Sequence, residues 1–249
     1  MDHIFWGIAG STLAGLATGL GAIPVLFPSL HSLSHRLKDE LLGFAAGVML
    51  AATSFSLLVP AIERGGPGIA ILGIVAGAFL LDLLDRIIPH EHFEKGKEGP
   101  SSALRKIWLF VLAITLHNFP EGLAVGVSFG SKNIADGITV AVAIGLQNVP
   151  EGLAVAVSLL GVGYRRKQAF LYALLTGLVE PLGGILGVGL VSFMHAFLPF
   201  GLALAGGAML FVIGDEIIPE THHGPGARYS TYALMIGFAL MMGLDTVLG

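Results

Sequence analysis

The chain has 249 residues, of which 54% are hydrophobic and only 12% are charged. Soluble domains carry about 25% charged residues, so this composition excludes an ordinary soluble domain and indicates an integral membrane protein. There is no cysteine, which excludes disulfides and thiolate metal sites. The formal net charge of −4 is small, so the placement of the charges is more informative than their sum.

Eight stretches satisfy the requirement of about 20 apolar residues for a helix that crosses a bilayer. They are roughly 4–27, 39–61, 68–89, 104–129, 135–160, 168–191, 197–219 and 230–248. The first stretch has no basic segment before it and no clear cleavage site, so it is predicted to be a span and not a signal peptide. Alternating strand patterns are absent, so we expect an all-α integral membrane protein that forms a single transmembrane domain over 1–249.

The basic residues are distributed very unevenly between the two sides of these spans. Two of the 13, Arg64 and Lys132, fall on the side that holds both termini, and the other eleven fall in the loops after the first, third, fifth and seventh spans. Cytoplasmic loops are enriched in Lys and Arg. We therefore expect both termini to be extracytoplasmic, the loop at about 90–103 to be cytoplasmic, and the chain to lie in the cell (plasma or inner) membrane.

One decamer occurs twice. Residues 117–126 read HNFPEGLAVG and residues 147–156 read QNVPEGLAVA, on neighbouring spans that a short loop makes antiparallel. A fainter repeat aligns 13–23 with 175–185, which puts Thr18 opposite Glu180, and 45–50 with 205–210. These matches predict that spans one to three are an inverted copy of spans six to eight, in a 3+2+3 arrangement around spans four and five. Inverted repeats are typical of transporters with a substrate site near the midplane.

Polar residues gather at the centres of spans four, five and six. His117 and Glu121 are four residues apart and share a helix face, Gln147 and Glu151 repeat this spacing, and Glu180 lies near the middle of the sixth span. A charge at the bilayer centre costs on the order of 2.5–3.5 kcal/mol, and no Lys or Arg lies in the central part of any span to pair with these glutamates. The pattern predicts a cation site.

The types of ligand indicate which cation. Imidazole suits zinc, copper, iron and nickel, whereas carboxylate and amide oxygens suit harder ions, so the mixture favours a borderline first-row divalent metal that is bound reversibly. Pro120 and Pro150 cannot donate to the carbonyls of Leu116 and Leu146, and Pro181 follows Glu180 in the same way. We therefore expect kinks that expose carbonyl oxygens beside the side-chain ligands.

At these residues the sequence resembles the ZIP family of divalent-metal transporters, in particular the bacterial branch with HNxPEG on the fourth helix. The resemblance implies eight spans and a binuclear centre near the midplane. It implies a first metal site of His117, Glu121, Gln147 and Glu151. It implies a second site of Asn118, Glu121, Asn148, Glu151 and Glu180. Some relatives carry Asp in place of Asn148, and the neutral residue here lowers the negative charge of the second site by one.

A metal exit path is expected toward the cytoplasmic ends of the spans. Its candidate ligands are Asp215, Glu216, Glu220, His90, His92, His222 and His223, with Glu216 foremost and Ser54 as a residue that lines the path. Any one of them is equally well explained as an interfacial residue that meets water.

Three functions are compared. The first is a divalent-metal importer that carries Zn²⁺ foremost, with iron, manganese, cobalt or cadmium as alternatives, and no nucleotide-binding motif is present. The second is another cation carrier such as a calcium/cation exchanger, which His117 disfavours because calcium prefers all-oxygen sites. The third is an intramembrane metalloenzyme, which the lack of an H-E-x-x-H motif disfavours. The expected partners are divalent metal ions and the lipid bilayer, with no nucleic acid, and a homodimer is left open.

Overall fold

The structure is a computed structural model that describes residues 2–27, 34–87, 103–131, 133–161, 163–222 and 226–248. Some side chains within these ranges are not described, among them those of 84–87, 103–110, His117, Glu216 and Glu220. All regular structure in the described part of the chain is helical. The prediction of an all-helical protein is confirmed.

The elements in chain order are α1 (Asp2–Ala22), η1 (Ile23–Leu26), α2 (His35–Ala51), η2 (Ala52–Leu58), α3 (Val59–Ile87), α4 (Ala103–Phe129), α5 (Ile134–Gly161), α6 (Arg166–Gly177), α7 (Glu180–Phe193), η3 (His195–Phe197), α8 (Leu198–Val212), η4 (Ile213–Ile217), α9 (Ile218–Thr221) and α10 (Ala227–Leu248). The segments η1 and η3 are 3₁₀ helices. The segments η2 and η4 are π-helical and continue α2 and α8.

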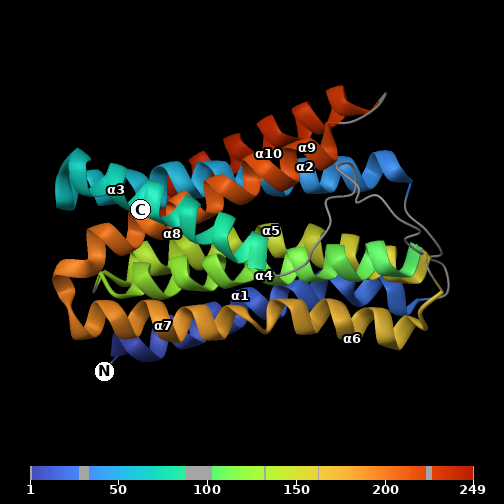
Figure 1. The fold of residues 1–249 in the computed structure, drawn as a ribbon, viewed down its shortest axis with the longest axis horizontal. Helices are drawn as coiled ribbons and strands as arrows, with labels where there is room; N and C mark the ends of the chain where they lie inside the picture. Colours follow the sequence, from blue (N-terminus) through green and yellow to red (C-terminus); the bar gives the residue numbers. More distant parts are fainter. Residues whose placement is uncertain are drawn as a thin grey trace.

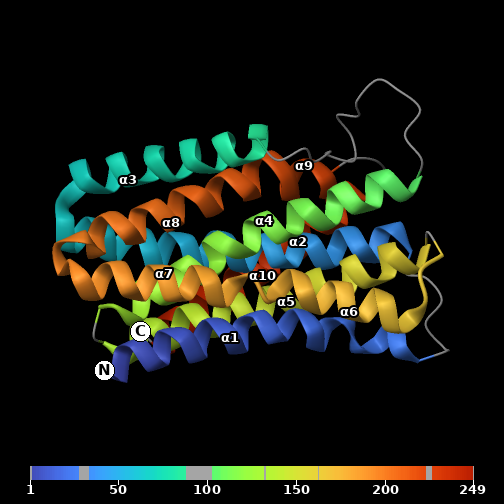
Figure 2. The ribbon, with the colours of Figure 1, turned by 60° about the horizontal axis from the view of Figure 1, so that its bottom comes forward.

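Six helical stretches within the described ranges are long and apolar enough to cross a membrane. One of them, Arg36–Leu83, has 48 residues, about twice the length that one crossing needs. It contains Gly66, whose φ of 77° is not helical, followed by Pro67. Glycine adopts positive φ without steric cost, and Figure 2 shows the chain that continues from α2 reversing direction at the start of α3. This long stretch therefore contains two antiparallel helices.

The sixth expected span, 168–191, is interrupted in the structure. α6 ends at Gly177 and α7 begins at Glu180, with Leu178 and Val179 in a turn between them. Pro181 lies in the first turn of α7, where its missing N–H costs nothing. α4 and α5, by contrast, continue through Pro120 and Pro150 without a break.

The helices form an elongated bundle whose members run along one common long axis (Figure 1). α1 packs most extensively on α5, α4 on α7, α2 on α10 and α3 on α8. α1 begins and α10 ends at the same end of the bundle in both ribbon views (Figures 1 and 2). The largest buried apolar cluster joins residues of α2, α3, α4, α5 and α8, so it surrounds the central parts of α4 and α5.

Glycines allow the closest of these helix contacts. A Cβ at Gly126 of α4 would overlap the carbonyl of Gly184 in α7, and a Cβ at Gly47 of α2 would overlap the carbonyl of Leu234 in α10. Small residues at membrane helix interfaces let backbones approach closely. The high glycine content of the sequence is therefore used in helix packing.

Candidate metal site

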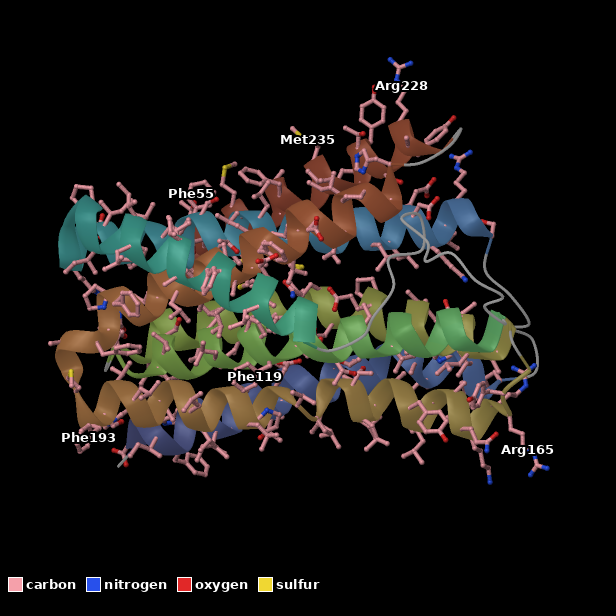
Figure 3. All side chains as sticks on the ribbon, in the orientation of Figure 1. Phe55, Phe119, Arg165, Phe193, Arg228 and Met235 are labelled. Carbon is pink, nitrogen blue, oxygen red and sulfur yellow. The ribbon has the colours of Figure 1, made fainter. Side chains whose placement is uncertain are left out.

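The three motif glutamates lie in the interior of the bundle. Glu121 and Glu180 are fully buried, and Glu151 is 1% exposed. Phe119, which belongs to the first decamer, lies near the middle of the long axis, whereas Arg165 lies at one end and Phe193 at the other (Figure 3). All three carboxyl groups are therefore withdrawn from the surface of the bundle.

Close backbone contacts join α4 to α7 and α5 to α1 beside these glutamates. A Cβ at Gly122, the residue after Glu121, would overlap the carbonyl of Glu180 on α7. A Cβ at Gly152, the residue after Glu151, would overlap the carbonyl of Thr18 on α1. The glycine that follows each glutamate in the repeated motif thus lets a neighbouring helix approach the site.

Hydrogen bonds join the polar residues across helices. The Nε2 of Gln147 donates to Oε1 of Glu121, which links α5 to α4. The Nδ2 of Asn148 donates to Oε1 of Glu180 at 2.5 Å and to the carbonyl oxygen of Ala14 at 2.8 Å. Asn148 therefore links α5 to both α7 and α1, a role that its position in the sequence does not reveal.

The carboxyl groups also interact with one another. Glu121 interacts electrostatically with Glu151 and Glu180, and Glu180 with Glu151. Like charges at close range in a medium of low dielectric repel strongly. A divalent cation among them would turn this repulsion into attraction.

Several oxygen atoms at the site have no hydrogen-bond donor among the described residues. They are Oε2 of Glu121, Oε2 of Glu180, Oδ1 of Asn118, Oδ1 of Asn148 and Oε1 of Gln147. Buried polar groups are normally satisfied, and each exception calls for an explanation such as an ion or water. Because carboxylate and amide oxygens are ligands of divalent metals, these orphaned acceptors fit a metal ion.

His117 lies on α4 at the position expected, but its side chain is outside the described residues. Among the side chains that are described, no three His, Asp or Glu residues are arranged to hold one ion. The described side chains therefore do not by themselves form a three-carboxylate or carboxylate–histidine cage.

Two candidates of the exit path lie on the π-helical segments. Ser54 lies on η2 and donates from Oγ to the carbonyl oxygen of Leu50 at 2.7 Å. Asp215 lies on η4 and is half-buried. η2 packs on α8 and η4 packs on α2. The two π segments thus lie in a second pair of neighbouring helices, α2 and α8.

His222 follows α9 and already has partners for both ring nitrogens. Its Nδ1 lies 3.0 Å from the carbonyl oxygen of Ile218, and its Nε2 lies 3.1 Å from Oγ1 of Thr231. It would have to release one of these contacts before it could bind metal. His90, His92 and His223 lie outside the described residues, as do the side chains of Glu216 and Glu220.

Two polar contacts at the opposite end were not expected from the sequence. Arg64 forms an ion pair with Asp136 at 2.8 Å, and Ser56 donates to Asp245 at 2.5 Å. They join the start of α3 to the start of α5, and η2 to the end of α10. Neither contact has a sequence signature, because the partners are far apart in the chain.

Comparison with known proteins places these features in a family. The family model described as ZIP zinc transporter matches residues 90–245. "Zinc transporter GufA" of Myxococcus xanthus is 48% identical, with 98% of this chain and 99% of that protein aligned. "Zinc transporter ZIPB" of Bordetella bronchiseptica is 46% identical, with 99% and 82% aligned. Human "Zinc transporter ZIP11" is 34% identical, with 100% and 98% aligned.

These similarities extend over the whole chain and confirm the family that the two decamers resemble. The relatives are named as transporters, and so the expectation that the protein is a transporter and not an enzyme is confirmed as well. The chain belongs to the ZIP family of zinc transporters.

Proposed function

We propose that this protein imports zinc into the cytoplasm through a binuclear site between α4, α5 and α7. The observation that carries the proposal is the set of buried acceptor oxygens around Glu121, Glu151 and Glu180. Three buried carboxyl groups can ionise only with positive charge nearby, and the central parts of the spans contain no Lys or Arg. A divalent cation supplies that charge and leaves again during transport.

The donor set divides into two half-sites that we name by their helices. The α4 half-site consists of His117, Asn118 and Glu121, and the α5 half-site consists of Gln147, Asn148 and Glu151 with Glu180 beside them. The hydrogen bond from Gln147 to Glu121 bridges the two half-sites, which supports the proposal that Glu121 and Glu151 bridge two metals. Imidazole on one edge favours zinc-like ions, and the oxygen ligands of the other admit iron, manganese, cobalt or cadmium.

We further propose that the chain crosses the membrane eight times. The crossings are α1 with η1, α2 with η2, α3, α4, α5, α6 with α7, α8 with η4 and α9, and α10. The reversal at Gly66 and the position of both chain ends at one end of the bundle (Figure 1) support an even number. The basic residues then place both termini outside the cytoplasm.

Matched contacts support the proposal of an inverted repeat. Under the alignment of 13–23 with 175–185, Thr18 corresponds to Glu180, and under the repeated motif Gly152 corresponds to Gly122. Gly152 approaches the carbonyl of Thr18, and Gly122 approaches the carbonyl of Glu180. The same close approach therefore occurs twice, between α5 and α1 and between α4 and α7.

The π-helical segments and the helix pairs also correspond between the two repeats. The alignment of 45–50 with 205–210 places η2 opposite η4, so the two π-helical segments occupy corresponding positions. In the proposed repeat α2 corresponds to α8, and α3 corresponds to α10. The α2–α10 pair therefore corresponds to the α8–α3 pair, and both pairs pack extensively. π-Helical turns are frequent at functional sites, and we propose that the pair η2 and η4 borders the metal path.

The test is zinc uptake by the purified protein in liposomes that contain a zinc-sensitive dye. We expect Glu121→Ala to lower the initial uptake rate at least tenfold, because loss even of a residue that supports a metal ligand costs about 10–100-fold in affinity. Glu63→Ala is the matched control, since Glu63 is an exposed glutamate near a helix end. It should transport at the wild-type rate.

The result that would overturn the central assignment is uptake by Glu121→Ala at the wild-type rate. Binding and direction are separated by a second measurement with the same vesicles. An imposed zinc gradient in either direction shows whether flux toward the side of the basic loops is favoured. Flux only toward the opposite side would contradict import.

A further inference from the structure

Thr18 occupies in α1 the place that Glu180 occupies in α7. A Cβ at Gly177 would lie 2.8 Å from Cβ of Thr18, and a Cβ at Gly15 would lie 3.4 Å from Cβ of Glu180. Gly15 and Gly177 correspond in the internal alignment, and each would meet the carbonyl of the other. Thr18 and Glu180 are thus equivalent in space as well as in sequence, with a carboxyl group on one side and a hydroxyl on the other.

The partners of these two residues differ. Glu180 accepts a hydrogen bond from Asn148 at 2.5 Å, and the corresponding pair across the repeat is Thr18 with Asn118. Oγ1 of Thr18 and both polar atoms of Asn118 have no hydrogen-bond partner among the described residues. Thr18 is only 1% exposed and Asn118 is fully buried. Within the described part of the chain, Thr18 and Asn118 are therefore both buried and without a side-chain hydrogen bond, whereas the corresponding residues Glu180 and Asn148 bond each other.

The length of the side chain explains why Thr18 forms no hydrogen bond with Asn118, whereas Glu180 bonds Asn148. The threonine side chain ends two bonds short of the reach of glutamate, so its hydroxyl cannot take the position of the Glu180 carboxyl oxygen. A buried water is held where two to four polar groups converge. Oγ1 of Thr18 lies beside α6, where a Cβ at Gly177 would come within 2.6 Å of it. The repeat pairs this hydroxyl with the amide of Asn118, and together they would supply three such atoms.

We propose that Thr18 determines specificity in the transport site: its hydroxyl and the amide of Asn118 form a neutral subsite that binds one water of a partly hydrated divalent cation. The inference rests on the proposed function. The α5 half-site has two carboxylates, Glu151 and Glu180, whereas the α4 half-site has one, Glu121. Because Thr18 is neutral, the α4 half-site holds the ion less tightly and releases it.

The test compares three substitutions at one position. Thr18→Val keeps the shape and removes the hydroxyl, Thr18→Ser keeps the hydroxyl, and Thr18→Asp adds a charge. Zinc affinity is measured by calorimetry on the purified protein in detergent, and KM and maximal rate are measured in liposomes. Thr12→Val is the matched control, because among the described residues Oγ1 of Thr12 is seen to bond the carbonyl oxygen of Ile8 in its own helix.

We expect Thr18→Val to weaken zinc binding and raise KM about tenfold, the scale of lost outer-shell partners. Thr18→Ser should stay within about twofold of wild type. Thr18→Asp should bind zinc more tightly and turn over more slowly. Thr12→Val should leave affinity and KM unchanged.

Wild-type affinity and KM in Thr18→Val would overturn the inference. If Thr18→Val does not fold, a fourth substitution, Thr18→Ala, which also lacks the hydroxyl, decides: wild-type zinc affinity and KM in Thr18→Ala would then overturn the inference. Glu121→Ala, measured in parallel, separates the two proposals. If it abolishes uptake while Thr18→Val behaves as wild type, only the role of Thr18 is wrong, whereas wild-type uptake by Glu121→Ala contradicts the proposed function itself.

Discussion

Asn148 shows how one side chain serves both the fold and the site. Its Nδ2 donates to Glu180 and to the carbonyl oxygen of Ala14, which directs Oδ1 away as an acceptor. An aspartate could not make either donation, because an ionised carboxylate has no N–H or O–H. The neutral residue therefore stabilises the site in the absence of metal, at the cost of one negative charge for a second ion.

Replacement of Asn148 by Asp should make the stability of the protein depend on metal. Loss of a buried donor costs about 2 kcal/mol, and a protein of this size loses about 2–4 °C in melting temperature per kcal/mol. We expect Asn148→Asp to melt roughly 5 °C below wild type in chelator. Zinc should raise its melting temperature more than that of wild type, since metal pairs with the added charge. An equal zinc-induced rise in both proteins, measured by thermal unfolding in detergent, would show that Asn148 does not face the metal.

At the scale of the helix, the face on which a glycine lies determines whether it allows a neighbouring helix to pack closely. α7 carries Gly187 and Gly189 two residues apart, on opposite sides of the helix. A Cβ at Gly187 would lie 2.6 Å from the carbonyl oxygen of Leu123 in α4, whereas a Cβ at Gly189 would meet nothing within 4 Å. The pair provides an internal comparison of a packed and an unpacked glycine in one element.

Gly187→Ala should destabilise the protein and Gly189→Ala should not. Overpacking against backbone costs about 1–3 kcal/mol, while alanine at an open helical position gains about 0.5–1 kcal/mol over glycine. Thermal unfolding in detergent measures both variants against wild type. A melting temperature for Gly187→Ala at or above that of Gly189→Ala would contradict the close α4–α7 contact, and with it the placement of Glu180 beside Gly122.

The local part of the site was predictable from sequence, and the contacts between helices were not. The spacing of Asn118 and Glu121 places them on one helix face by geometry alone, and the lack of a basic partner indicated a cation. The bond from Asn148 to Ala14 depends on how α5 and α1 are rotated against each other, which side-chain periodicity does not determine. Likewise, Pro120 and Pro181 looked equivalent as helix breakers. In the structure α4 continues through Pro120, whereas the chain before Pro181 is interrupted at Leu178 and Val179.

At the scale of the whole molecule, charge asymmetry predicts which end of the bundle faces the cytoplasm. Arg165 and Arg228 lie at the end opposite to Phe193 (Figure 3), in agreement with the proposed crossings. The lack of cysteine makes the direction directly measurable. Single cysteines can be placed at Glu63 and Lys167, which are both exposed and lie near opposite ends of the proposed spans.

We expect a membrane-impermeant maleimide to label Glu63→Cys in intact cells and Lys167→Cys only after permeabilisation. The unsubstituted chain, which has no thiol, is the background control, and retained zinc uptake shows that each variant is folded. Cytoplasmic Lys and Arg orient spans because basic loops resist translocation, so this outcome places the basic side inside. The reverse pattern would put the basic loops outside. It would also turn the proposed exit path, with Asp215 and His222, into an entrance from the extracytoplasmic side.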